Sequence, residues 1–81
     1  MYELRYDPTV EAVWDSLPET ARDELDRAIL AACQDPQAAT EPYGEDDGVM
    51  RSLVLPHVMA VLLVNHAPRQ TVRILQISYL V

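Results

Sequence analysis

"RSLVLPHVMAVLLVN", residues 51–65, decides the fold of this chain. It begins with Arg51 and contains no further Lys or Arg. A Pro-His pair at 56–57 separates two runs rich in Val and Leu, a pattern typical of two β-strands joined by a short turn. A short connection forces neighbouring strands to be antiparallel. The sequence therefore predicts a hairpin with strands over 49–55 and 58–65, and apolar side chains occupy both faces of the second strand.

Along the sequence, an acidic loop comes before this hairpin and a third predicted strand comes after it. Residues 71–80 again mix β-branched and other apolar residues, after the turn-like stretch HAPRQ. Residues 37–48, QAATEPYGEDDG, hold both glycines of the chain together with a proline and four carboxylates. That composition is typical of a solvated loop.

The first 36 residues predict a short strand and two helices. YELRY (2–6) alternates as a strand does. Asp7 and Pro8 form a helix start, because Asp caps a helix and Pro is tolerated at its first position. Pro18 ends this helix and opens a second one, which stops at Asp35-Pro36. The first helix has one apolar stripe at helical spacing: Val10, Val13, Trp14 and Leu17.

The resulting order is strand, helix, helix, strand, strand, strand. It predicts one α+β domain over residues 1–81, with a helical hairpin packed on one face of a mostly antiparallel four-stranded sheet. Cys33 is the single cysteine, so no internal disulfide can form. The apolar run Val58–Val64 is too short to span a bilayer, which takes ~20 residues. We expect a cytoplasmic protein with no membrane partner.

The charge of the chain is strongly acidic. Thirteen Asp and Glu face six Arg and no Lys, for a net charge of -7. Nucleic acids are gripped by neutralising their phosphates with Lys and Arg, so a broad nucleic-acid face is disfavoured. A basic polypeptide partner fits this charge better, and solubility alone also explains it.

Three stretches carry a family resemblance. They are YELRYDPTVEAVWDSLPETARDELDRAILAACQDP (2–36), EPYGEDDGVMRSLVL (41–55) and TVRILQISY (71–79). In order and local signals they resemble the RelE/ParE superfamily, the toxins of bacterial type II toxin–antitoxin modules. The resemblance implies a toxin held by a cognate antitoxin. It also implies action either by cleaving mRNA on the ribosome or by poisoning DNA gyrase, and no cofactor.

The resemblance also indicates where catalytic residues would lie. Ribonucleases of this superfamily use a cluster of Arg and Lys on the sheet, with a Tyr or His near the C-terminus, to stabilise charge on phosphorus and to transfer protons. Arg51 occupies the first position of that cluster. The second should lie between residues 56 and 60, PHVMA, where there is no cation. The remaining catalytic candidates are Arg51, His57, Arg73 and Tyr79.

Each of these candidates also has a purely structural interpretation. Arg51 can pair with the loop acids Asp46 and Asp47. His57 can be a solvated turn residue rather than a general acid or base. The pattern of the last strand does not settle whether Arg73 and Tyr79 lie on an open face. A metal site is not expected, because His57 and His66 stand at opposite ends of one strand.

The apolar character of residues 58–64 has two interpretations. The strand is either central in a tightly packed domain or part of an exposed surface that binds a partner. We favour a partner-binding surface of Met59, Val61 and Leu63 with Arg51. Its occupant would be an antitoxin helix or, as a homodimer, a second copy of the chain.

Three functions follow from the sequence. The leading one is a RelE/ParE-like toxin component that binds its antitoxin, with mRNA cleavage disfavoured by the missing cations. The second is an active ribosome-dependent mRNA endoribonuclease. The third is a ParE-like inhibitor of DNA gyrase, which acts by protein contacts.

Overall fold

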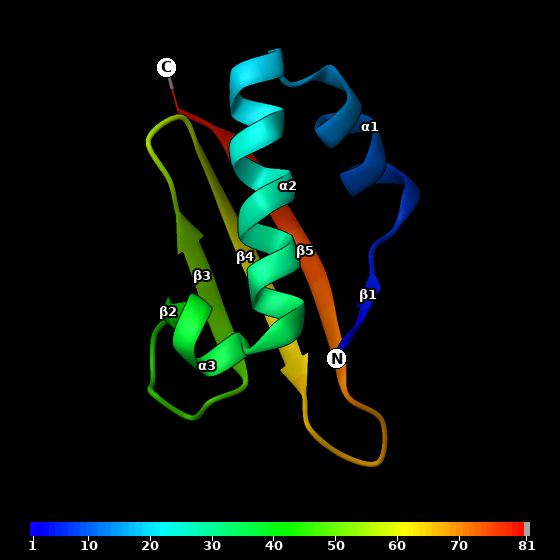
Figure 1. Ribbon diagram of the computed structural model, residues 1–81, viewed down its shortest axis with the longest axis vertical. Helices are drawn as coiled ribbons and strands as arrows, with labels where there is room; N and C mark the ends of the chain where they lie inside the picture. The colour runs from blue at the N-terminus through cyan, green and yellow to red at the C-terminus, as the bar shows by residue number, and fades with distance from the viewer. Residues whose placement is uncertain (81) are drawn as a thin grey trace.

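In the computed structural model, which describes residues 1–80, one five-stranded sheet packs against helices (Figure 1). The strand order is β1-β5-β4-β3-β2; β1 is parallel to β5 and all other neighbours are antiparallel. The strands are β1 (Glu3–Arg5), β2 (Glu41–Pro42), β3 (Met50–Val54), β4 (Val58–Asn65) and β5 (Thr71–Tyr79). The helices are α1 (Pro8–Ser16), α2 (Glu19–Gln34) and α3 (Pro36–Ala39).

The α+β class is confirmed, but the prediction of four strands is wrong. The fifth strand, β2, is a two-residue edge strand inside the acidic loop, where Glu41 pairs with Ser52. The Asp47 side chain accepts hydrogen bonds from the backbone N–H groups of Val49 and Met50, so this loop is ordered as it enters β3. The composition of residues 37–48 is typical of a loop and does not indicate β2, which consists of only two backbone pairings.

Capping residues set the helix boundaries. The Asp7 side chain accepts a hydrogen bond from the Val10 N–H at 2.9 Å, with Pro8 in the first turn. Asp35 stops α2, as the sequence predicts, but its carboxylate also accepts from Ala38 N–H and so begins α3. The same Asp-Pro signal therefore opens a helix as well as closing one.

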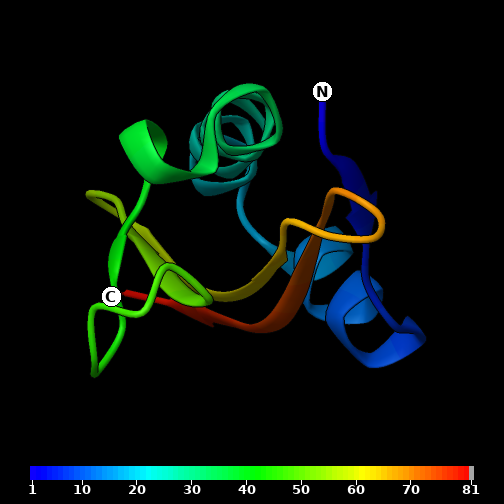
Figure 2. The same cartoon turned by 90° about the horizontal axis from the view of Figure 1, so that it is seen from below.

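The core lies between α2 and one face of the sheet. α2 runs across β4 and β5 on that face, and β3 and β4 carry no helix on the other side (Figure 2). From the helices the core takes Val10, Leu17, Ala21, Leu25, Ile29, Ala32 and Cys33. From the strands and their ends it takes Leu53, Val58, Ala60, Leu62, Val64, Val72, Ile74 and Ile77. None of the helices within residues 1–80 is long and apolar enough to cross a membrane.

A β-bulge in β5 changes which residues of that strand face the core. Val61 pairs with Gln76 and Leu62 pairs with Ile74, so Leu75 has no partner in the ladder. An extra residue reverses the alternation of side chains beyond it. Ile74 before the bulge and Ile77 after it are therefore both buried, although one is even-numbered and the other odd-numbered.

Candidate partner-binding face

The side of the sheet that α2 does not cover is here called the open face (Figure 2). Its members alternate with the core-facing residues of the same strands, although Ser52 and Val61 are themselves only 5% and 8% exposed. They are Met50, Ser52 and Val54 from β3, Met59, Val61 and Leu63 from β4, and Arg73, Gln76 and Ser78 from β5. This surface is continuous, because the three strands are neighbours in the sheet.

The centre of the open face is apolar. Cross-strand pairing joins Met50 to Leu63 and Val54 to Met59, with Val61 between them opposite Ser52. We call Met50, Val54, Met59, Val61 and Leu63 the apolar stripe. Val54 is 61% exposed, and the stripe lies beside the polar residues of β5. Met50, Met59 and Leu63 are half-buried and Val61 is 8% exposed, so the accessible apolar surface of the stripe comes mainly from Val54 and from parts of the two methionines and Leu63.

The structure groups three of the four residues predicted to bind a partner. Met59, Val61 and Leu63 share the open face. Arg51 lies on the opposite, helix-covered side of β3, because it is paired with the buried Leu62. Successive side chains of a strand point to opposite faces of the sheet, so a position that is one residue away lies on the other face.

Arg51 is 4% exposed and fully engaged in hydrogen bonds. Its Nε donates to Thr40 Oγ1 at 2.9 Å, and its Nη2 donates to the carbonyl oxygens of Thr40 at 2.7 Å and of Gln37 at 3.3 Å. Its Nη1 lies 3.4 Å from Asp46 Oδ1, the loop carboxylate that the sequence suggested as a partner. These contacts tie the acidic loop and the end of α3 to β3, so Arg51 acts as a structural cation here.

His57 lies in the turn between β3 and β4 and contacts α2. Glu24 accepts a hydrogen bond from the His57 backbone N–H at 3.0 Å, and its other carboxylate oxygen contacts His57 Nδ1. The hydrogen bond to the His57 side chain is the main reason why the pKa of Glu24 is lowered from its usual 4.5. The imidazole is thus held against the helix rather than turned toward the open face.

This pairing predicts an acid-dependent loss of stability. A carboxylate whose pKa is lower in the folded chain stabilises the fold above its unfolded pKa, and that contribution disappears as pH falls through the folded pKa. Urea midpoints are to be measured from about pH 6 to about pH 3 for the parent chain and for Glu24→Gln. As the pH falls below 4.5, the usual pKa of Glu24, the midpoint of Glu24→Gln should decrease less than that of the parent chain. Parallel pH profiles for the two proteins would contradict this assignment. Both proteins should still lose some stability as the pH falls, because hydrogen bonds from backbone N–H groups also lower the pKa of Asp47.

The structure does not bring the four catalytic candidates together. Arg73 lies on the open face opposite Leu63, whereas Tyr79 pairs with the buried Val58 on the helix-covered side. Six residues of strand separate them by roughly 20 Å. The bulge at Leu75 is the reason why Arg73 and Tyr79, which share a parity in the sequence, face opposite ways.

The two histidines are also far apart and separately engaged. His66, at the far end of β4, contacts the Tyr2 hydroxyl at 2.7 Å and the Gly48 carbonyl oxygen at 3.1 Å. Within residues 1–80 no three His, Cys, Asp or Glu side chains are grouped to hold a metal ion. Cys33 is buried, and desolvation raises the pKa of its thiol.

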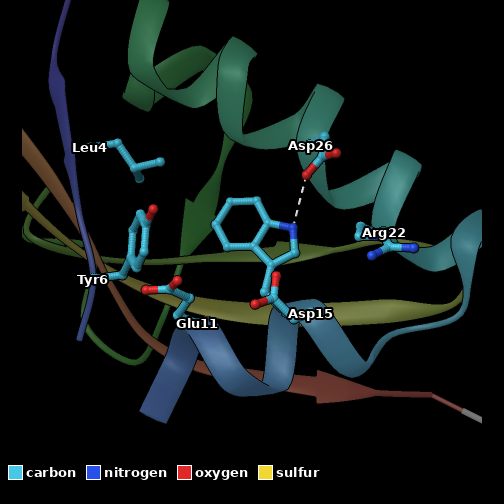
Figure 3. Close-up of a pocket in the computed structure, with 7 residues that line it drawn as sticks. Leu4, Tyr6, Glu11, Asp15, Arg22 and Asp26 are labelled. Carbon is cyan, nitrogen blue, oxygen red and sulfur yellow. Dashed lines mark hydrogen bonds between the residues drawn. The ribbon is translucent and has the colours of Figure 1, made fainter. Parts of the chain in front are cut away.

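Two of the surface hollows have mostly polar or charged linings, and one of these includes the catalytic candidate Arg73. One, of about 290 Å³, is formed by β1, α1 and α2 around Trp14, whose Nε1 donates to Asp26 Oδ1 at 2.8 Å (Figure 3). It is lined by Leu4, Tyr6, Glu11, Trp14, Asp15, Arg22 and Asp26. The other, of about 370 Å³, lies at the end of the open face near the β4–β5 loop. It is lined by Arg5, Asn65, Pro68, Arg69, Thr71 and Arg73, and we call it the arginine pocket.

Of the arginines in the arginine pocket, the sequence singles out only Arg73. Arg5 stands in β1 and Arg73 in β5, and only the parallel pairing of these strands makes them neighbours. Arg69 joins them from the loop that precedes β5. The alternating pattern of residues 2–6 could have placed Arg5 on a sheet face, but not next to Arg73.

Comparison with known proteins identifies the fold. No protein-family model matches the sequence, and no curated protein is significantly similar to it. The isolated E. coli RelE toxin superposes with a TM-score of 0.80 at 19% identity, over 100% of this chain and 86% of that one. A RelE mutant with two arginines replaced by alanine matches with a TM-score of 0.76 and 19% identity. For the free mutant the match covers 95% of this chain and 81% of that one. For the mutant in complex with a peptide of the antitoxin RelBc it covers 99% of this chain and 83% of that one. The chain therefore has the fold of the E. coli RelE toxin, as the family resemblance of its sequence implied.

Proposed function

We propose that this chain is the toxin-type component of a bacterial type II toxin–antitoxin module. In this proposal it binds a cognate antitoxin polypeptide across the open face and does not cleave mRNA. The observation that carries the proposal is the apolar stripe, which occupies the surface where the family resemblance leads one to expect catalytic cations. The E. coli RelE mutant in complex with a RelBc antitoxin peptide supports a polypeptide as the partner class.

The stripe is chemically suited to a polypeptide. Contiguous apolar side chains that reach the surface mark interaction sites. Val54 is exposed, and Met50, Met59 and Leu63 are half-buried beside it. Met50 and Met59 have flexible, polarisable side chains that adapt to different partners, and the branched Val54, Val61 and Leu63 add apolar area. An amphipathic helix laid across such a surface buries its own apolar face.

The same surface is poorly suited to cleaving RNA. Attack of a ribose 2′-hydroxyl on phosphorus builds negative charge that positioned cations must stabilise. The apolar stripe supplies none, Arg51 is buried on the other side, and His57 contacts Glu24. Arg73 lies roughly 20 Å along the strand from Tyr79, too far for both to act on one phosphate.

Replacing one residue of the stripe should disrupt the proposed complex. Leu63→Glu is expected to weaken binding of the polypeptide encoded by the adjacent gene by about 30-fold or more, because a charge would be buried in the interface. Leu30→Glu is the matched control, since Leu30 is an exposed leucine on α2. Both variants should unfold like the parent chain, and affinity is measured by titration calorimetry. Equal affinities for the two variants would refute the open face as the binding surface.

The toxin assignment is tested by tightly controlled induction of this chain alone in a bacterial host. We expect growth arrest that co-expression of the adjacent gene relieves, with no new mRNA 5′ ends when cellular RNA is mapped. Undisturbed growth with the folded chain present would refute a toxic activity. New 5′ ends on ribosome-bound mRNA would overturn the statement that the chain does not cleave RNA.

A further inference from the structure

The arginine pocket concentrates positive charge in an acidic molecule. Three of the six arginines of the chain line it, together with the polar side chains of Asn65 and Thr71, and no Asp or Glu does. Of the remaining three arginines Arg51 is buried, so only Arg22 and Arg27 lie on the surface together with the carboxylates of an acidic chain. A volume of about 370 Å³ is room for one or two side chains of another molecule.

Only one of the three arginines of this pocket is paired with a carboxylate of residues 1–80. Arg5 and Arg73 are direct partners in the parallel pairing of β1 with β5, so two like charges stand on adjacent strands about 4.8 Å apart. Such a juxtaposition is unfavourable without a counter-charge. Arg5 forms an exposed ion pair with Glu3 at 3.0 Å, whereas Arg69 and Arg73 form no ion pair with any of residues 1–80.

We propose that the arginine pocket binds the carboxylates of an acidic segment of the partner polypeptide. This inference rests on the proposed function, because it assigns the chemistry of the partner that covers the open face. Guanidinium groups bind carboxylates through paired, charge-assisted hydrogen bonds, and three of them around one hollow suit two neighbouring acidic side chains.

The position of the pocket joins it to the apolar stripe. Arg73 is the cross-strand partner of Leu63, and Leu63 is the partner of Met50, so one row across the sheet runs from the pocket into the stripe. Neighbouring strands are about 4.8 Å apart, close to the 5.4 Å pitch of a helix. A partner helix whose apolar residues cover the stripe would therefore need acidic residues within about two turns of them, on the side toward the β4–β5 loop.

A polypeptide fits this surface better than a nucleic acid. Single-stranded nucleic acids bind by stacking their bases on aromatic rings beside a basic groove. The open face has no aromatic side chain among its members. The net charge of -7 favours a basic partner over the rest of the surface, so the acidic segment is assigned to the arginine pocket alone. Aliphatic side chains next to a small cationic pocket match an amphipathic acidic segment instead.

The test uses the full chain and small probes without apolar groups, so that its result does not depend on the apolar stripe. The probes are acetylated, amidated triglutamate, the matching triglutamine, and a tetrauridine that carries the same three negative charges. The ¹⁵Nε resonances of all six arginines are followed by NMR during each titration at about 20 mM salt, where screening is weak. We expect saturable, millimolar binding of triglutamate, with shifts at Arg5, Arg69 and Arg73 and none at Arg22 or Arg27.

Variants sharpen this expectation. Arg69→Gln combined with Arg73→Gln should weaken triglutamate binding at least about fivefold, since each charge-assisted pair is worth a few-fold in affinity. Arg22→Gln combined with Arg27→Gln, two changes on α2, should leave it unchanged. Glu3→Gln should tighten binding, because it releases Arg5 from its ion pair.

Each contrary outcome overturns the proposal. Equal binding of triglutamate and triglutamine, no saturable shift, or equal shifts at all arginines would mean that the pocket does not select carboxylates. Tighter binding of tetrauridine than of triglutamate would assign the pocket to phosphates. A second copy of this chain as the natural occupant would appear as concentration-dependent dimers that Arg69→Gln with Arg73→Gln abolishes. Failure of the antitoxin complex with intact triglutamate binding would instead refute the proposed function alone.

Discussion

Arg51→Ala is expected to lower the free energy of unfolding by about 3 kcal/mol, because it removes a buried, fully hydrogen-bonded cation. The guanidinium donates to Thr40 Oγ1 and to the carbonyl oxygens of Thr40 and Gln37. Removing it leaves these acceptors without their donor and opens a cavity between β3 and α3. A domain of this size has about 5 kcal/mol in total, so the loss brings it close to unfolding.

The measurement is urea unfolding followed by the fluorescence of Trp14, the only tryptophan. With a slope near 1 kcal/mol per molar, the midpoint should fall by about 3 M. Arg51→Lys should fall by roughly half as much, because an ammonium cannot reproduce the fork of donors. Arg73→Ala, an exposed arginine of the same sheet, should change the free energy of unfolding by less than about 0.5 kcal/mol.

This comparison separates a structural role of Arg51 from a catalytic one. A catalytic arginine on an open face would be replaceable without loss of stability, whereas the hydrogen bonds seen here make its loss a folding defect. If Arg51→Ala unfolds at the same urea concentration as the parent chain, the hydrogen bonds of Arg51 do not stabilise the fold. A role for Arg51 at a reaction site would then regain support.

Local signals predicted those parts of the structure that short-range chemistry determines. Asp7-Pro8 and Asp35-Pro36 mark helix boundaries because a side chain caps the backbone within three residues. The Pro-His turn predicts the central hairpin because so short a connection leaves only an antiparallel pairing for the strands beside it. Sequence proximity suggests Asp46 and Asp47 as partners of Arg51; Asp46 is in contact with it, whereas the Asp47 side chain accepts from the backbone of Val49 and Met50.

The candidate site was harder to predict because it depends on pairings between distant segments. The alternating residues of 58–64 indicate two faces but not which one the helices cover. The arginine pocket requires the parallel pairing of β1 with β5, across more than sixty residues of sequence. Nothing in residues 71–79 signals that Leu75 is an extra residue, because a bulge is defined by the partner strand.

The burial pattern of β5 predicts a large loss of stability at Ile74 and a small one at its neighbour Leu75. Ile74→Ala should cost about 3 kcal/mol, since Ile74 is 1% exposed and its loss leaves a cavity under α2. Leu75→Ala should cost less than about 1 kcal/mol, because Leu75 is 43% exposed and lies outside the ladder. Urea unfolding gives both values, and Ile74→Val, at about 1 kcal/mol, serves if the alanine variant is too unstable to measure.

One further variant decides how the last strand presents its functional groups. Without the bulge, and with Ile74 buried, odd-numbered residues 73, 75, 77 and 79 would share the open face, and Arg73 and Tyr79 would stand together as a catalytic pair. With it, Ile77 is 7% exposed and Tyr79 pairs with buried Val58, while Arg73 stays on the open face beside Leu63. Ile77→Ala should therefore cost about 3 kcal/mol, like Ile74→Ala. A loss below about 1 kcal/mol at Ile77 would indicate regular alternation and would restore the ribonuclease hypothesis. The expected large loss keeps Arg73 away from Tyr79 and in the arginine pocket, where it is available to a carboxylate.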